Sequence, residues 1–411
     1  MITVLLAITV PLFSGGQGEA DEVTTVRFLN FSASGGNEDH LGEIRDAFES
    51  ENPDVEVEVE TIGYEDYFTQ LQTRIAGGQA PDAFELNFEN FAAYGNRGLL
   101  RDLDDDLTAT DVNLDDLNSQ ALDAFSLDGT QYGLPASFST VMLFYNQDLF
   151  DEAGLDYPTD DWTWTEAHEA AEAIRDLGED TFGLFQPIQF HEFYKVVQQY
   201  GGGLISDDGS EFTVDRPENV TALETMVGRI QDSNIMPSER QLSGMGDWDL
   251  FLSGRLGMLV TGIWAFPHFT DNAEFDWDVV VEPAADRRAT HFFANGLSVH
   301  ADSNVAEAAV RWIAYLSASE TAGQVRLDAG WELPASNHSD LVAAYAEQTP
   351  PDNREAVFTS LDYLVTPPIV TDFSRMADIV TSHLESASQG DTAPGDALQN
   401  AQRQLESEID L

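Results

Sequence analysis

The sequence of 411 residues contains no cysteine and a single lysine, Lys195. Without cysteine the chain has no disulfide, no cysteine-ligated zinc site, no thiol nucleophile and no thiol for lipid attachment. Positive charge is scarce overall, because 18 Lys+Arg stand against 74 Asp+Glu and give a formal net charge of −56. A nucleic-acid-binding protein needs a basic surface, and an anionic membrane repels an acidic one, so neither partner is expected.

The excess of carboxylates indicates adaptation to a very salty solvent. In ordinary buffer such a charge strains the compact state through self-repulsion, whereas molar salt shortens the Debye length to about 3 Å. We therefore expect the host to be an extreme halophile. An acidic run such as residues 104–106 is then best interpreted as a solvated turn, with calcium binding as the alternative.

Long hydrophobic runs are also few, and the longest stands at the start of the chain. Residues 1–13 are too short to cross a membrane as a helix and fit the apolar part of a signal peptide. Residues 14–18 are small and flexible. We expect residues 1–22 to be a signal peptide or tether remnant, and the protein to be secreted and associated with the cell surface.

From residue 23 onward the hydrophobic pattern alternates between strand and helix periods. Strands are predicted at residues 25–30, 55–60 and 83–86, and the second of them alternates Val with Glu. Apolar residues at helical spacing predict helices between them, at residues 41–48 and 64–75. This order predicts an α/β fold with a parallel, doubly wound sheet, whose ligand lies beyond the carboxyl ends of the strands.

The rest of the chain is richer in helix. Helical patterns dominate residues 164–259, followed by a predicted strand at 292–299 and a helix at 305–316. Residues 358–409 are also predicted to be helical. The three glycines at 201–203 are not a phosphate-binding loop, because no strand leads into them and no Lys-Ser/Thr pair follows.

Short motifs occur in one order over nearly the whole chain. They are Ala-Pro-Asp-Ala-Phe at 80–84, Gly-Leu-Leu at 98–100, Tyr-Gly-Leu-Pro at 132–135, Tyr-Asn-Gln-Asp-Leu-Phe at 145–150, Trp-Thr-Glu at 164–166, FLSGRLGMLVTGIW at 251–264, and the Gly-Trp-Glu-Leu-Pro-Ala segment at 330–335. Together they resemble the extracellular sugar-binding proteins of ABC importers, of the maltose- and multiple-sugar-binding type. The family's lipid-anchoring cysteine is absent.

The resemblance implies a periplasmic-binding-protein-like fold of type II topology, with two α/β lobes, a hinge and a central ligand cleft. The first lobe is expected to contain residues 23–137 plus 272–329, and the second residues 138–271 plus 330–411. The expected protein is a receptor and not an enzyme. It carries no cofactor, and its partners are a small-molecule sugar or oligosaccharide and the permease and ATPase of an importer. A monomer suits this role.

A sugar site combines aromatic rings, which stack on apolar C–H faces, with amides, carboxylates and hydroxyls that bind sugar hydroxyls. By this chemistry and by the resemblance, the expected ligand-binding residues are Ser34, Asn37, Asn87, Glu89, Asn90, Phe138, Ser139, Gln189, Phe190, His191, Trp264, Asn295, Trp331, Glu332 and Phe373. Trp264 is the first choice for stacking, while Trp331 suits either the cleft or the core. These residues include no Lys or Arg, and Arg287 and Arg288 are expected outside the cleft, so an uncharged ligand is favoured.

Two alternatives remain open from the residues alone. A different solute is possible, such as a polyamine held by Glu89 and Glu332, or ferric iron, which would require paired tyrosines. A secreted glycoside hydrolase would need two carboxylates about 5–10 Å apart across the scissile bond. No motif for such a nucleophile or acid is visible.

Overall fold

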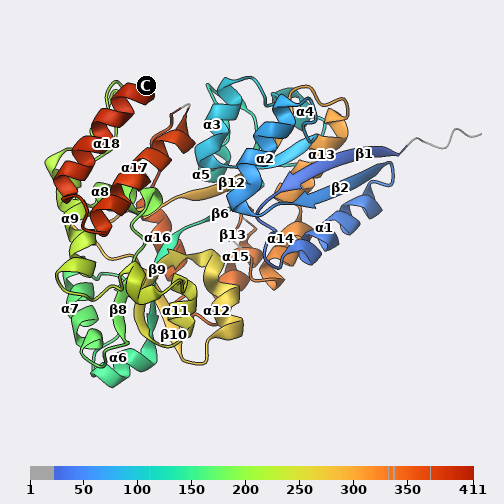
Figure 1. Ribbon diagram of the computed structural model, residues 1–411. Coiled ribbons are helices and arrows are strands. Elements are labelled where there is room, and N and C mark those ends of the chain that lie inside the picture. The colour runs from blue at the N-terminus through green and yellow to red at the C-terminus, as the bar shows by residue number, and fades with distance from the viewer. Residues whose placement is uncertain (1–22, 111, 332, 337, 371) are drawn as a thin grey trace, which may run out of the picture.

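The computed structural model describes residues 23–110, 112–331, 333–336, 338–370 and 372–411. Within them the elements form two lobes, each built on one β-sheet with helices packed against it (Figure 1). The predicted α/β class and two-lobe fold are confirmed. The segment interpreted as a signal peptide lies outside the described residues.

The first lobe holds a six-stranded sheet with the strand order β13-β6-β12-β3-β1-β2. Its strands are β1 (Thr24–Asn30), β2 (Val55–Thr61), β3 (Ala83–Asn87), β6 (Leu134–Ser139), β12 (Phe293–Val299) and β13 (Leu333–Pro334). Strand β1 lies parallel to β2 and β3, as the alternation of strands and helices predicts. Strand β12 is antiparallel to both β3 and β6.

The alternation of Val and Glu along β2 determines which of its side chains are buried and which face solvent. Val55 and Val57 are buried, whereas Glu56 and Glu58 are exposed on the opposite face. The side of Val55 and Val57 is covered by α1 (Glu38–Glu51), α13 (Ala306–Ala318) and α14 (Glu320–Asp328). Helix α2 (Tyr64–Ala76) packs on the other side of the sheet, against Leu29 and Phe84. The large fully buried Trp312 anchors the core on the side of Val55 and Val57. Its ring packs edge-on against other aromatic rings of the core, at centroid distances of 5.6 Å from Phe28 and 5.3 Å from Phe48.

The second lobe holds a four-stranded sheet with the order β10-β7-β9-β8. Its strands are β7 (Val141–Asn146), β8 (Phe182–Phe185), β9 (Leu256–Gly262) and β10 (Trp277–Val281), and its neighbouring helices are α6 (Gln147–Ala153), α7 (Trp164–Arg175), α11 (Asp247–Leu252), α12 (Phe266–Asn272) and α16 (Ala356–Ser360). Helix α7 lies directly on β8, since a Cβ added at Gly183 would stand 2.1 Å from the carbonyl oxygen of Ala171. Strands β8 and β9 interrupt the stretch expected to be mainly helical.

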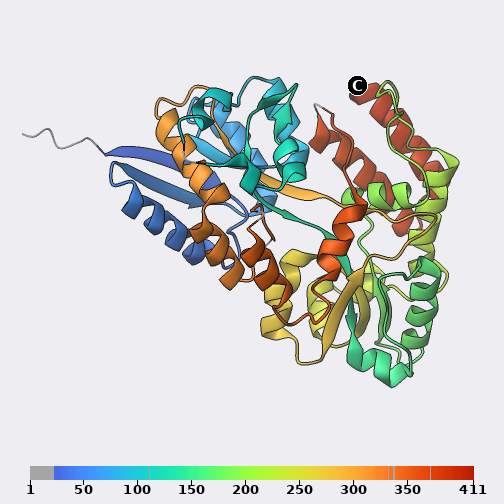
Figure 2. The same ribbon diagram turned by 180° about the vertical axis from the view of Figure 1, so that it is seen from behind.

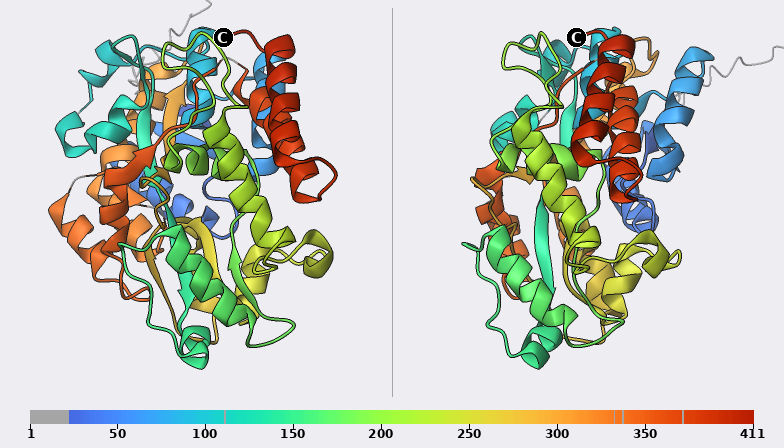
Figure 3. Two further views of the ribbon diagram at one scale, coloured as in Figure 1. Left: turned by 90° about the vertical axis from the view of Figure 1, so that its left-hand side faces the viewer. Right: turned by 60° about the vertical axis from the view of Figure 1, so that its left-hand side comes forward.

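Four longer helices pack together beside this sheet (Figure 3). They are α8 (Phe190–Gln199), α9 (Pro217–Gln231), α17 (Phe373–Ser388) and α18 (Pro394–Glu408). Their apolar faces enclose a separate core that includes Val196, Leu223 and Leu398. The remaining short elements are α3 (Phe88–Asn96), α4 (Asp104–Leu107), α5 (Ser119–Asp123), α10 (Glu239–Leu242), α15 (Ser339–Ala346), β4 (Ser126–Leu127), β5 (Thr130–Gln131), β11 (Thr290–His291), β14 (Leu364–Val365) and the 3₁₀ turns Leu114–Asp116, Ile263–Ala265 and Leu361–Tyr363.

The chain passes between the lobes more than once (Figure 2). It leaves the first sheet after β6 and enters the second at β7, then returns between β10 and β12. The expected lobe boundary between residues 271 and 272 is therefore wrong, because β10 pairs with β7 of the second sheet. The expected start of the final second-lobe segment at residue 330 is also too early, since β13 pairs with β6 of the first sheet.

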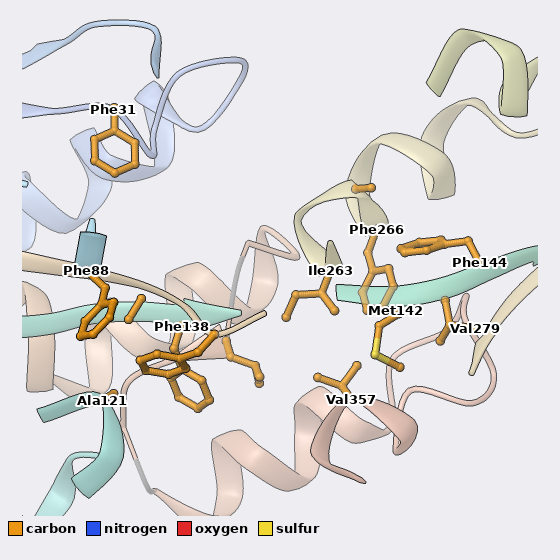
Figure 4. Close-up of a cluster of buried hydrophobic side chains, with 14 of the residues drawn as sticks. Phe31, Phe88, Ala121, Phe138, Met142, Phe144, Ile263, Phe266, Val279 and Val357 are labelled. Atoms are coloured by element: carbon orange, nitrogen blue, oxygen red, sulfur yellow. The ribbon is translucent and has the colours of Figure 1, made fainter. Parts of the chain in front are cut away.

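An apolar cluster continues from one lobe into the other along the β6–β7 crossover. Figure 4 shows Phe31 and Phe88 of the first lobe at one end of this cluster, and Phe144 and Phe266 of the second lobe at the other. Phe138, near the end of β6, lies between them. The lobes are thus joined by packed side chains as well as by the chain itself. Among the described helices, none combines the length and the apolar character needed to cross a membrane.

Candidate functional site

The first lobe meets the second at the amino-terminal end of α3, directly after strand β3. Glu89 projects from the first turn of this helix, and its side chain is fully buried. Its Oε1 lies 3.1 Å from Nε2 of His291, which belongs to the segment between the two sheets. Carboxyl ends of parallel strands are where ligands bind in open α/β sheets, so the contact forms at the edge expected for a site.

Side-chain amides fix the geometry of this helix start. Asn87 is the N-cap residue of α3, and its Oδ1 accepts hydrogen bonds from the backbone N–H and side-chain Nδ2 of Asn90. Nδ2 of Asn87 donates to the hydroxyl of Tyr64 at 3.0 Å. The hydroxyl of Ser374, in the first turn of α17, donates to Oδ1 of Asn90 at 3.4 Å and bridges the lobes.

His191 brings the second lobe into the same contact. It stands in the first turn of α8, and its ring centroid lies 5.4 Å from that of His291. Its buried Nδ1 has no hydrogen-bond partner among the described residues, and neither has Oε2 of Glu89. We call Glu89, His191 and His291 the interlobe cluster, because donor atoms of all three lie within 4.8 Å of one another.

Burial governs the ionisation of the interlobe cluster. Loss of hydration lowers the pKa of His191 to about 4 and holds the pKa of His291 well below its ordinary value. Desolvation also raises the pKa of the Glu89 carboxyl, against the weaker influence of His191. Both imidazoles are consequently neutral at pH 7 and offer lone pairs or N–H donors to a ligand.

Aromatic rings surround these polar groups. Phe190 packs edge-on against Phe373 at a centroid distance of 5.4 Å, which joins α8 to α17. Trp264 packs edge-on against Phe293 at 5.0 Å and is partly exposed. A Cβ at Gly262 would lie 2.0 Å from the Trp264 ring, so only glycine allows the indole to fold back over this position. Rings and hydrogen-bonding groups are therefore adjacent, as carbohydrate recognition requires.

A buried ionic network holds α8 in place. Nζ of Lys195 lies 2.8 Å from Oε2 of Glu192 on the same helix and 2.6 Å from Oε2 of Glu282, the residue that follows β10. Nε2 of Gln199 donates to Oε1 of Glu282 at 3.2 Å. These contacts tie the helix that carries His191 to the segment that leads to His291.

The structure brings part of the expected site together. Asn87, Glu89 and Asn90 of the first lobe lie near the interlobe contact, and the second lobe contributes the expected residues Phe190, His191 and Phe373. Trp264 joins them through Phe293 and His191, whose ring centroids are 5.8 Å apart.

Other expected residues lie outside the interlobe cluster. Ser34 and Gln189 are exposed, and Oδ1 of Asn37 contacts Nδ1 of His40 at 3.2 Å. Ser139 is buried at the end of β6 beside Phe138, and Asn295 is paired across the sheet with Asn87 and Ser137.

Trp331 occupies the apolar core of the first lobe, where the guanidinium of Arg326 stands 4.2 Å from its ring. This is the core position that the sequence also allowed for it. Glu332 lies outside the described residues.

Sequence reasoning missed several residues of the contact: His291, Phe293, Tyr194 and Ser374. The hydroxyl of Tyr194 hydrogen-bonds Nδ1 of His291 and the carbonyl of Val365. His291 and Phe293 are two positions apart, and this spacing at the start of a predicted strand could have placed them on one face.

A cavity of about 530 Å³ opens beside the interlobe cluster. Tyr194, whose hydroxyl contacts His291, also lines this cavity together with Gln198, the glycines at 202–203 and the segment 366–370. Arg287, which is expected outside the ligand cleft, lines this cavity as well. Its Nε donates to the backbone carbonyl of Gln198, and Asp207 and Asp410 line the same cavity.

Comparisons with known proteins identify the family and fold relatives of this chain. Residues 41–323 match the sequence profile of the family described as bacterial extracellular solute-binding protein. An ABC substrate-binding protein of Listeria monocytogenes, solved in complex with cycloalternan, is 46% identical, with a TM-score of 0.90 over 94% of this chain and 98% of that one. The GacH receptor of Streptomyces glaucescens, solved without ligand and with acarbose, is 22% identical and shares the fold, with a TM-score of 0.82 over 94% and 98%. The maltotriose-binding protein of Pyrococcus abyssi is 26% identical over 235 residues, which are 56% of this chain and 48% of that protein.

Proposed function

Because the chain belongs to the bacterial extracellular solute-binding protein family, we propose that it captures an oligosaccharide between its two lobes and delivers it to an ABC importer. Members of this family are binding proteins and not enzymes. The proposal extends to the partners: a membrane permease that receives the closed receptor, and a cytoplasmic ATPase. It also includes export to the cell surface and action as a monomer.

The observation that carries this proposal is the chemistry of the interlobe contact. Aromatic rings from both lobes, among them Phe293 and Phe373, adjoin the amide of Asn90, the carboxyl of Glu89 and the imidazole of His191. No lysine or arginine side chain is among these groups. Such a surface suits a neutral polyhydroxylated ligand better than a phosphate or an acidic amino acid. The 46% identity to a protein solved in complex with cycloalternan supports cycloalternan as the first candidate ligand.

Binding would proceed through lobe closure. In the open receptor, sugar hydroxyls would take up hydrogen bonds from Asn90 and Glu89 on the first lobe, and an apolar sugar face would stack on the partly exposed Trp264 of the second. Ser374 of the second lobe donates a hydrogen bond to Asn90 of the first, so the two lobes are in direct contact at this point. A ligand that contacts both lobes stabilises the closed form by its differential affinity for that form.

The test is ligand-dependent stability, measured in molar KCl against a panel of cyclic and linear gluco-oligosaccharides, monosaccharides and spermidine. At 100 times its dissociation constant, a bound ligand should add about 2.7 kcal/mol to the free energy of unfolding. Trp264→Ala should abolish the shift and the accompanying tryptophan fluorescence change. Trp312→Phe, in the first-lobe core, is the control that alters an indole away from the contact.

A shift with one oligosaccharide that is lost in Trp264→Ala but kept in Trp312→Phe is the expected result. Stabilisation by spermidine alone would keep the receptor role and contradict the sugar. Equal responses to every sugar in the wild type and in Trp264→Ala would contradict binding at this contact.

A further inference from the structure

The ring of His291 is held on both sides. Its Nδ1 contacts the hydroxyl of Tyr194, and that hydroxyl stands 3.1 Å from the carbonyl of Val365. The same carbonyl already accepts the backbone N–H of Phe292. The hydroxyl of Tyr194 can therefore donate to Nδ1 of His291, which places the ring proton on Nε2.

That nitrogen faces a carboxylate. Nε2 of His291 lies 3.1 Å from Oε1 of Glu89, which is a normal hydrogen-bond distance inside the protein. The two atoms are joined either by the ring proton or by a metal ion that both of them bind.

The other free atoms of the cluster distinguish these two cases. A proton between Glu89 and His291 satisfies Oε1 and Nε2, but it leaves Oε2 of Glu89 and Nδ1 of His191 buried without a partner in the part of the chain that the structure describes. A metal ion placed among the three residues satisfies a carboxylate and both imidazoles at once. Unpaired buried polar atoms are costly, so the full set of donors fits a metal better than a proton.

The donor set has the composition and spacing of a transition-metal site. Two imidazole nitrogens and one carboxylate oxygen are ligands typical of Zn²⁺ and related divalent ions. Ligands bound at about 2.1 Å in a tetrahedron are separated by roughly 3.4 Å, and the donor atoms here lie within 4.8 Å of one another. Tyr194 supplies the outer hydrogen bond that orients a metal-binding imidazole.

We propose that Glu89, His191 and His291 form a binding site for one divalent transition-metal ion, with Zn²⁺ as its representative, that links the two lobes. Glu89 comes from α3 of the first lobe, His191 from α8 of the second and His291 from the segment between the sheets. All three donors converge only when the lobes are together. The metal consequently binds the closed form and favours it.

The experiment is a calorimetric titration of the full chain with ZnCl₂ in molar KCl, where salt suppresses loose binding to surface carboxylates. The wild type should bind one equivalent tightly, with a chelator-reversible rise in melting temperature. Glu89→Gln and His191→Gln should each weaken this event at least about tenfold. The matched control is His168→Gln, on α7, whose Nδ1 contacts the carbonyl of Trp164 at 2.9 Å outside the cluster. It should leave binding unchanged.

Co²⁺ provides a second readout that does not depend on the variants folding. The wild type should give the intense visible absorption of a low-coordinate site with nitrogen ligands, and Zn²⁺ should displace it. Weak binding of many ions, unchanged by Glu89→Gln and His191→Gln, or a Co²⁺ spectrum equal to that of the hydrated ion, would overturn the proposal. The titration uses no sugar, so its failure is distinguishable from failure of the proposed function.

Discussion

Lys195, the only lysine in the chain, is completely buried, with its Nζ 2.6 Å from Oε2 of Glu282. Its second partner is Glu192, so one ammonium faces two carboxylates inside the second lobe. A chain with 74 acidic residues has thus kept its single ammonium side chain where it neutralises buried charge. The contact also connects α8, which carries His191, to the segment that enters the first lobe.

Lys195→Met should be strongly destabilising. The substitution keeps the approximate volume but leaves Glu192 and Glu282 buried without their cation, a loss of about 3–5 kcal/mol. Chemical denaturation in molar KCl at pH 8 measures it. The control is Arg74→Met, which breaks the solvent-exposed pair with Glu60 and should cost no more than about 1 kcal/mol. Equal effects of the two substitutions would contradict a structural role for the buried network.

The pH dependence of stability should contain a contribution from Glu282. Burial raises the pKa of its carboxyl from 4.5 to about 7 in the folded protein. Between these values the folded state binds more protons than the unfolded state, so this contribution to stability falls as pH rises from about 4.5 to 7. The change amounts to about 3 kcal/mol. The two carboxylates raise the pKa of Lys195, so its own contribution stays constant over this window.

Glu282→Gln isolates that contribution. The free energy of unfolding of the wild type, measured relative to the variant, should decrease from pH 4.5 to 7 and then level off. Comparing the two proteins cancels the titration of the other acidic residues. A difference that is independent of pH would contradict the raised pKa of Glu282.

Salt should stabilise the fold by screening. Glu56 and Glu58 are exposed side by side on β2, and they exemplify the like charges that crowd the surface. The melting temperature should rise steeply as KCl increases from 0.1 to 2 M, because the Debye length falls from about 10 Å to below 3 Å. Sucrose at equal molarity is the control, since it stabilises by exclusion from the surface and not by screening. Equal stabilisation by both solutes would count against adaptation to high salt.

Two glycine substitutions should act in opposite directions. Gly183→Ala places a Cβ 2.1 Å from the backbone oxygen of Ala171 and should push α7 away from β8, with a loss of several kcal/mol, as in other overpacked cores. Gly42→Ala lies in α1, where the nearest atom to the new Cβ is 4.0 Å away, and should stabilise by about 0.5–1 kcal/mol. The melting temperatures of both variants, compared with that of the wild type, test these two predictions. Destabilisation by Gly42→Ala would contradict the absence of close contacts around a Cβ at this position of α1.

The periodicity of apolar residues predicted those strands and helices whose formation depends on residues close together in the sequence. The first three strands and the helices between them follow from periods of two and 3.6 residues, and they occur where expected. Strand β8 was missed because four consecutive apolar residues, Phe182–Phe185, carry no period that separates a buried strand from a helix. The lobe to which Trp277–Val281 belongs depends on pairing with β7, which is remote in sequence.

In the candidate site, too, residues in local motifs were predicted, and a residue defined by contacts remote in sequence was missed. Glu89 and His191 were predicted because each follows or begins a recognisable motif or helix. His291 was missed because its partners, Tyr194 and Glu89, are 97 and 202 residues away along the chain. Trp331 was placed in either core or cleft, and its burial beneath Arg326 arises from packing that one segment cannot reveal.

The burial of Lys195 makes the protein its own reporter of unfolding. While the second lobe is folded, amine-reactive reagents find no lysine side chain on the surface, because the only one has no exposed area. Each opening of this lobe uncovers one ε-amine. The rate at which a single acyl group is attached to Lys195, followed by mass spectrometry, therefore counts opening events of one chosen region without any engineered label.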